Sequence, residues 1–69
     1  MTAHTHPAVE AIEAAAEEGR QAAREGRDFP TACPYLFCRF PGIEQEEFEV
    51  TKRPLMNAWF SAWKRASRQ

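Results

Sequence analysis

Apolar residues recur at spacings of three and four through the first third of the chain, which is the period of one face of an α-helix. The positions on this stripe are Val9, Ile12, Ala16, Gly19, Ala23 and Gly26. Most residues between them are Ala, Glu, Gln and Arg, all of which favour helix. The pattern predicts a helix over residues 7–25, with Pro7 in its first turn and Gly26 as its C-terminal stop.

The stripe narrows along the helix, because Val9 and Ile12 are followed by the small residues Ala16, Gly19 and Ala23. A glycine inside a helix costs about 1 kcal/mol relative to alanine. Close packing against a neighbour explains why Gly19 stands there. The second half of this helix is therefore predicted to offer a shallow groove for a bulky ring.

A second apolar face lies near the end of the chain. It consists of Leu55, Met56, Trp59, Phe60, Ala62, Trp63 and Ala66. This spacing predicts a helix over residues 54–67 with Pro54 in its first turn. Trp59 and Trp63 are one turn apart, and we expect them to pack on the groove formed by Ala16, Gly19 and Ala23.

Residues 27–54 contain four prolines and a glycine, so they cannot form one helix. They also contain five rings, at Phe29, Tyr35, Phe37, Phe40 and Phe48. Residues 46–51 alternate acidic and apolar side chains with no second strand to pair with, which predicts extended chain. The predicted fold is all-α, with two antiparallel helices joined by a long aromatic-rich, proline-rich loop. We expect a single helical-hairpin domain over residues 7–67, a flexible tail over 1–6 and a short tail over 68–69.

The net charge of −1 hides a strong asymmetry along the chain. Residues 52–69 contain five cations and no acid, whereas acids outnumber cations both in residues 1–28 and in residues 29–51. Clustered Lys and Arg are typical of nucleic-acid binding, but they also stabilise the C-terminal end of a helix. No run approaches the roughly 20 apolar residues of a membrane span, and the N-terminus lacks signal-peptide features. These features predict a cytoplasmic protein without a membrane partner.

Two cysteines and two histidines are the candidate metal ligands. Cys33 and Cys38 have a spacing found in zinc sites, and His4 and His6 are available to complete a tetrahedral set. The histidines lie in the predicted tail, and the residues between the cysteines favour burial of both thiols as small hydrophobes. We expect no metal, no cofactor and, in a cytosolic chain, no disulfide.

The sequence also contains no recognisable set of catalytic residues. The three glycines are scattered and do not form a phosphate-binding loop, and no histidine lies in the predicted domain to act as a general base. The sequence therefore predicts a protein that is not an enzyme. Rings interleaved with Arg and Lys are instead typical of proteins that hold single-stranded RNA.

The Cys33-Pro34-Tyr35 triplet is predicted to be a structural turn. Pro34 fixes its own backbone angle and pushes Cys33 toward an extended conformation. Tyr35 is expected to lay its ring on the helix pair while its hydroxyl finds a polar partner.

An ordered set of motifs resembles the ribosome modulation factor family, the small bacterial proteins that include the Rmf/CrpP group. The matching pieces are Glu18-Gly19-Arg20 with Ala23 and Gly26-Arg27, then Cys33-Pro34-Tyr35, then Trp59-Phe60-Ser61-Ala62-Trp63-Lys64-Arg65-Ala66. They span about residues 18–66. The structural part of the motif is Gly19, Gly26, Cys33, Pro34, Trp59 and Trp63.

The resemblance implies two helices joined by a loop and a protein that binds ribosomal RNA on the small ribosomal subunit. On this hypothesis the RNA-binding residues are Arg20, Arg24, Arg27, Tyr35, Arg39, Lys64 and Arg65. Another branch of the group is described as phosphorylating a fluoroquinolone, for which this sequence holds no suitable residues. Unlike the strongly basic family members, this chain is slightly acidic and has an acidic insert over residues 44–49. The alternative is a protein-interaction module that uses its acidic face and aromatic loop to bind a basic protein partner.

Overall fold

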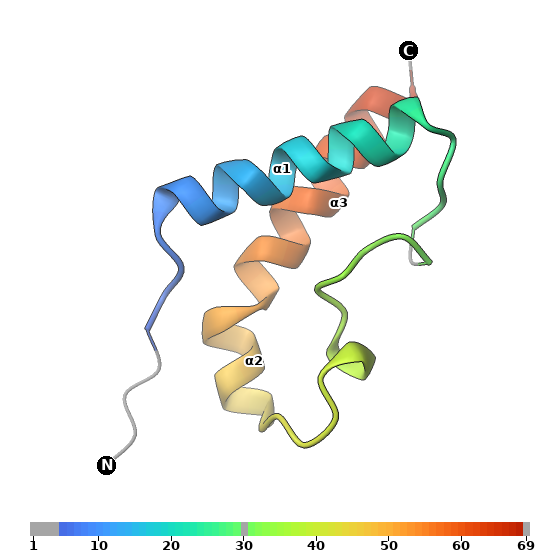
Figure 1. The fold of residues 1–69 in the computed structure, drawn as a ribbon. Helices are drawn as coiled ribbons and strands as arrows, with labels where there is room; N and C mark the ends of the chain where they lie inside the picture. The colour runs from blue at the N-terminus through green and yellow to red at the C-terminus, as the bar shows by residue number, and fades with distance from the viewer. Residues whose placement is uncertain (1–4, 30, 69) are drawn as a thin grey trace.

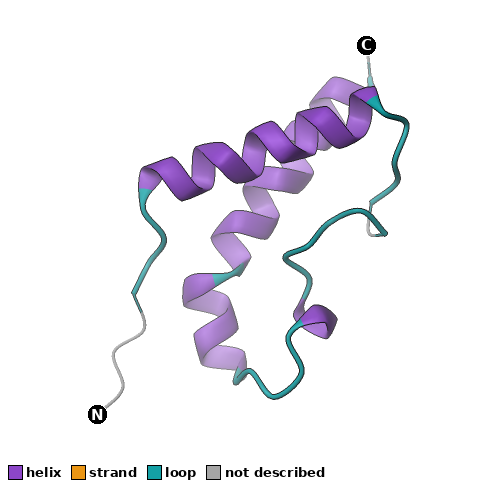
Figure 2. Cartoon of the chain, in the orientation of Figure 1, coloured by secondary structure: helices purple, strands orange, loops and turns teal. Residues whose placement is uncertain are grey.

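The computed structural model describes residues 5–29 and 31–68, and within them the fold is all-α, as predicted (Figures 1 and 2). Helix α1 covers Val9–Arg24, a 3-10 turn η1 covers Phe37–Arg39, α2 covers Gln45–Thr51 and α3 covers Arg53–Ser67. No strand occurs in these described residues. Residues 1–4 of the predicted N-terminal tail and residue 69 lie outside the described ranges.

Helix α1 begins two residues later than predicted and ends one residue earlier. Its N-cap is Ala8, so Pro7 lies before the helix rather than in its first turn. At the other end Gly26 has a φ of 73°, a left-handed conformation that glycine adopts without steric cost. The N–H of Gly26 bonds the carbonyl of Ala23, and the N–H of Arg27 bonds that of Ala22, which is the Schellman arrangement. The predicted stop at Gly26 is confirmed.

Helices α1 and α3 cross in the same direction, so the predicted antiparallel pair is wrong. Gly19 lies against the backbone of Trp59, and the carbonyl of Arg27 accepts a hydrogen bond from Trp63, so the contacts advance together along both helices. Figure 1 shows the C-terminal ends of both helices at the same corner of the molecule. A short turn enforces antiparallel neighbours, whereas the long connection over residues 25–52 returns the chain to the starting end.

The acidic segment that was predicted to be extended is the helix α2. Glu46 and Glu47 lie in its first turn, where negative charge complements the helix dipole. Phe48 is buried there and meets the Phe37 ring edge-on, with 5.1 Å between the ring centroids. The alternation of Glu with Phe and Val is also compatible with a seven-residue helix that buries one ring, so this pattern alone does not distinguish the helix from extended chain.

Pro54 separates α2 from α3. It lies in the first turn of α3, as predicted. A proline at this position has no N–H for the carbonyl of Val50, and its ring clashes with that carbonyl, so a helix cannot continue from α2 into α3. Lys52 forms the junction with φ −112° and ψ −35°. The break lets α2 turn away from the axis of α3 and carry Phe48 into the core.

The core is small. Its buried hydrophobic residues are Ala15, Ala22, Cys33, Phe48 and Trp59. Ala22, Cys33 and Trp59 form one cluster where α1 crosses α3, and Phe48 is buried on α2. The predicted groove of Ala16, Gly19 and Ala23 is wrong at two of its three positions. The buried residues are Ala15, Gly19 and Ala22, whereas Ala16 and Ala23, each one residue further along the chain, are half-buried. The predicted stripe is also wrong at its start, where Val9 is 67% exposed. A crossing buries only the middle of a helix, whereas a full hairpin would have covered its first turn.

Trp59 does pack on α1, but through its backbone at Gly19. A Cβ added at Gly19 would lie 2.9 Å from the carbonyl carbon of Trp59, and closer still to the carbonyl oxygen. The close-packing role of Gly19 is thus confirmed, and the predicted seat for an indole ring at this residue is wrong. The Trp59 side chain is instead enclosed with Ala22 and Cys33.

Four rings tie the connection to α3. They belong to Phe29, Trp59, Phe60 and Trp63. Phe29 lies 4.5 Å from Phe60 between ring centroids, and the two indoles stack at 6.4 Å. Trp63 also donates its Nε1–H to the carbonyl of Arg27 over 2.8 Å. Paired rings of this kind add about 0.5 to 1.5 kcal/mol each beyond the area they bury, so this cluster holds residues 27–29 on α3.

Candidate nucleic-acid interface

One groove between α1 and α3 is bordered by cations from both helices. We call it the basic groove; its volume is about 380 Å³ and its lining residues are Ala16, Arg20, Arg24, Ala58, Ser61, Ala62, Arg65 and Ala66. Arg20 and Arg24 are one turn apart on α1, and Ser61 and Arg65 are one turn apart on α3. All the other lining residues are alanines, so a ligand can approach both helix backbones closely.

None of the described residues that line the basic groove is acidic, but Glu17 pairs with two of its arginines. The Glu17 carboxylate lies 2.7 Å from Arg20 Nη2 and 3.8 Å from Arg24 Nη1. The hydrogen bond from Arg20, and then its charge, hold the pKa of Glu17 below its usual value. Exposed ion pairs of this kind contribute little net free energy. A phosphate entering the groove can therefore replace Glu17 as the partner of these guanidinium groups.

The structure brings together Arg20, Arg24 and Arg65 of the predicted RNA-binding set. Lys64 is adjacent to Arg65 on α3, but its Nζ lies over the Phe60 ring, 6.0 Å from the centroid. It therefore adds positive charge beside the groove without lining it.

The remaining predicted contacts lie elsewhere. Arg39 donates from Nη2 to the carbonyl of Thr31 over 2.5 Å, which ties η1 to the start of the loop. Arg27 pairs with Glu25 at 3.6 Å. Tyr35 donates its hydroxyl to Glu18 Oε1 over 2.9 Å. Each of these three groups has an intramolecular partner away from the basic groove.

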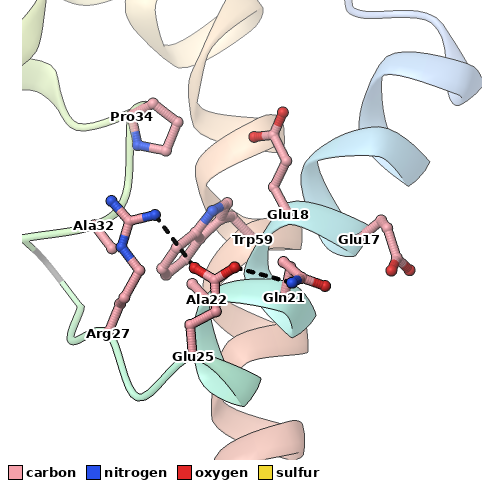
Figure 3. A pocket seen from close by; sticks show the side chains of 9 residues that line it. All are labelled: Glu17, Glu18, Gln21, Ala22, Glu25, Arg27, Ala32, Pro34 and Trp59. Carbon is pink, nitrogen blue, oxygen red and sulfur yellow. Dashed lines mark hydrogen bonds and ion pairs between the residues drawn. The ribbon is translucent and has the colours of Figure 1, made fainter.

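A second groove runs along the opposite flank of α1 (Figure 3). We call it the acidic groove; its volume is about 470 Å³, and its lining residues are Glu17, Glu18, Gln21, Ala22, Glu25, Arg27, Ala32, Pro34 and Trp59. Figure 3 shows Glu25 held between Gln21 and Arg27. Glu17 and Glu25 are paired with arginines, whereas Glu18 accepts a hydrogen bond from the neutral Tyr35 hydroxyl, so this flank of α1 remains negatively charged.

The Cys33-Pro34-Tyr35 turn forms part of the wall on the acidic side. Cys33 is fully buried, and this burial raises the pKa of its thiol. The Tyr35 ring packs against the core cluster, and burial followed by the hydrogen bond to Glu18 raises the pKa of its hydroxyl to about 12. The prediction that Tyr35 lies on the helix pair with a polar partner for its hydroxyl is confirmed. The turn is thus built into the fold on the flank away from the basic groove.

The two thiols differ in their surroundings. Cys33 is buried as predicted, but Cys38 is exposed in η1, so the predicted burial of both is wrong. Both cysteines are free. Among residues 5–29 and 31–68, no three His, Cys, Asp or Glu side chains are grouped to hold a metal. His4, one of the candidate ligands, lies outside the described residues.

Sequence reasoning identified the arginines of the basic groove but not its floor. The sequence pattern assigns Ala16, Ala62 and Ala66 to apolar helix faces and gives Ala58 no role. The useful signal was the recurrence of small residues at 58, 61, 62 and 66 beside the bulky Trp59 and Trp63, since such a stripe leaves room for a groove.

Comparison of the chain with protein-family models, with curated proteins and with solved structures gave no match. In the part of the chain that the structure describes, no helix has both the length and the apolar character needed to cross a membrane.

Proposed function

We propose that this chain is a non-enzymatic, ribosome-associated modulation factor that binds the small ribosomal subunit through ribosomal RNA. The supporting observation is the convergence of Arg20, Arg24 and Arg65, from two helices, on one groove with a floor of small residues. Guanidinium groups bind phosphate through paired N–H donors, which is why arginine is common at RNA backbone contacts. The resemblance of the Gly-Arg, Cys-Pro-Tyr and Trp-x-x-x-Trp motifs to the ribosome modulation factors supports the same function.

The groove suits an RNA backbone better than a base. Its polar side chains are the three guanidinium groups and the Ser61 hydroxyl, and among the described residues no ring lines it for stacking. Arg20 and Arg24 contact phosphates from one side of the groove, and Arg65 contacts a phosphate from the other. Recognition then depends on the spacing of phosphates rather than on sequence.

The distribution of charge restricts how the protein approaches RNA. Helix α2 carries Glu46, Glu47 and Glu49, and it lies at the opposite end of the molecule from the C-terminus of α3 (Figure 1). Phosphates repel that acidic end. The protein therefore meets RNA with the ends of α1 and α3 facing the backbone and with α2 directed away.

Other predicted contact residues serve the fold in this proposal. Arg39 and Tyr35 hold η1 and the Cys-Pro-Tyr turn in place, and Lys64 contributes long-range attraction. With about three phosphates contacted, the logarithm of the binding constant should fall with the logarithm of salt concentration with a slope of about −2 to −3.

Cosedimentation with purified small ribosomal subunits at low salt tests the proposal. Arg24→Gln and Arg65→Gln should each weaken binding and reduce the salt slope by about 1. The matched control is Arg53→Gln, which removes the same charge from an exposed residue paired with Glu49, outside the groove. If the folded protein does not cosediment at low salt, or if all three variants lose binding equally, the proposal is wrong.

A further inference from the structure

A third groove lies between η1, α2 and α3, and its character is apolar. Its volume is about 610 Å³. Leu36, Phe37, Phe48 and Met56 supply its apolar walls, and Glu49 and Arg53 lie on its rim. We call it the aromatic groove. It shares no lining residue with the basic groove, so the proposed RNA contact leaves it uncovered.

Phe37 is held open to solvent in this groove. It is 47% exposed, and in the described residues Val9 is the other large hydrophobic with an exposed side chain. The 3-10 turn fixes its position, because the N–H of Phe40 bonds the carbonyl of Phe37 over 3.1 Å and the ring rests edge-on against Phe48. A ring fixed in this way binds a partner with little loss of side-chain entropy.

The charge around the groove selects the kind of partner. Glu49 lies on the rim of the groove, where it bonds Arg53 over 2.5 Å. Glu46 lies beside Glu49 on the adjoining surface of α2, and Glu44 and Glu47 add negative charge at the start of this helix. In a two-fold dimer through this surface, the acidic α2 of one copy would face the acidic α2 of the other. That arrangement is repulsive, so a second copy of the chain is disfavoured as the occupant. A partner that carries cations beside apolar side chains is complementary.

We propose that the aromatic groove binds a basic amphipathic helix of a protein partner. The apolar side chains of that helix contact Phe37, Phe48 and Met56. Its cations meet the carboxylate of Glu49 on the rim and that of Glu46 on the adjoining surface of α2. Helices commonly bind in apolar grooves through side chains at positions i, i+3 or i+4, and i+7. This binding is independent of RNA, because its contacts lie on η1, α2 and the start of α3 rather than on the arginines of the basic groove.

A designed peptide provides the probe. It has about 15 residues, with leucines on one helical face and lysines on the other. We expect fluorescence anisotropy to show saturable binding to the full chain. Phe37→Ser should weaken this binding about tenfold, whereas the control Val9→Ser, at the other exposed hydrophobic, should leave it unchanged. Arg24→Gln should also leave it unchanged.

A second pair of measurements keeps the test decisive if Phe37→Ser fails to fold. Glu46→Gln changes an exposed side chain and should weaken binding of the peptide, whereas Glu13→Gln on α1 should leave the binding unchanged. A peptide with glutamate in place of lysine should not bind. Equal effects of Phe37→Ser and Val9→Ser, or of Glu46→Gln and Glu13→Gln, would place binding elsewhere and overturn the inference. Self-association of the chain that Phe37→Ser abolishes would make a second copy the occupant and would overturn it too.

Discussion

Replacing Gly19 by alanine should destabilise the protein, even though alanine is the better helix former. A Cβ at residue 19 would lie 2.9 Å from the carbonyl carbon of Trp59 and 3.1 Å from its Cα, with the carbonyl oxygen closer still. Both neighbours are helical backbone, which cannot rotate away as a side chain does. The helices must therefore separate, and a gap of roughly 0.5 Å already removes about a quarter of the dispersion attraction across a contact.

The magnitude follows from two opposing effects. Overpacking a tight site costs about 1 to 3 kcal/mol, and a rigid backbone contact favours the upper end of that range. The gain in helix propensity from Gly to Ala returns about 1 kcal/mol. We expect Gly19→Ala to lower the free energy of unfolding by about 2 kcal/mol, which corresponds to a decrease in Tm of roughly 8 to 16 °C for a domain of this size.

Urea denaturation followed by tryptophan fluorescence measures this change, because Trp59 lies at the contact itself. Ala14→Gly, at an exposed position of α1, isolates the propensity effect and should cost about 1 kcal/mol. If Gly19→Ala is as stable as the parent protein or more stable, then α1 and α3 do not approach each other at residue 19 and the described crossing is wrong.

Three further predictions concern the turn and the ring cluster. The phenolate absorbance of Tyr35, the single tyrosine, should titrate near pH 12. Because the pKa of Tyr35 is raised above the unfolded value of about 10, its contribution to the free energy of unfolding should be complete below about pH 10 and should be lost between about pH 10 and pH 12. A folded-state midpoint near 10 would contradict this. A thiol reagent should label the exposed Cys38 rapidly and Cys33 only upon unfolding, since burial raises the pKa of the Cys33 thiol; rapid labelling of both would contradict the burial. Trp63→Phe should lower the free energy of unfolding by about 1 kcal/mol, because the carbonyl of Arg27 loses its indole donor; an unchanged urea midpoint would mean that this bond contributes nothing.

Local signals predicted the two long helices and their ends well. Gly26 stops α1 because a left-handed residue is needed there, and Pro54 begins α3 because it lacks the N–H to continue α2. Such effects act within one or two turns of the residue, so the sequence displays them. The sequence pattern did not predict α2, because seven residues are too few for periodicity to distinguish a half-buried helix from an extended segment.

The direction of α3 relative to α1 was not predictable from the apolar stripes. A stripe shows which face is buried but not which way the neighbour runs. The displacement of the buried face from Ala16 and Ala23 to Ala15 and Ala22 has the same origin, because the crossing direction decides which flank of Gly19 is covered.

Three residues of the predicted RNA-binding set come together in one groove, and others, such as Arg39 and Tyr35, do not. Arg20, Arg24 and Arg65 come together because their spacings keep each on one flank of its helix. Arg39 and Tyr35 were assigned to RNA because rings and cations were adjacent in sequence. Their actual partners, the carbonyl of Thr31 and the carboxylate of Glu18, depend on the path of the loop, which no local pattern specified.

The shared direction of α1 and α3 has a consequence for how the chain folds. Trp63 bonds a residue 36 positions earlier, and Gly19 meets Trp59 across a similar separation. A helical protein with such distant contacts must close a long loop, at a cost in chain entropy, before its core residues make stabilising contacts. Folding is therefore slower than in helical bundles with local contacts. During synthesis α1 emerges well before Trp59, so its buried face has no partner until most of the chain is complete. The core therefore forms only after α3 has been synthesised, when the aromatic residues of α3 pack against α1.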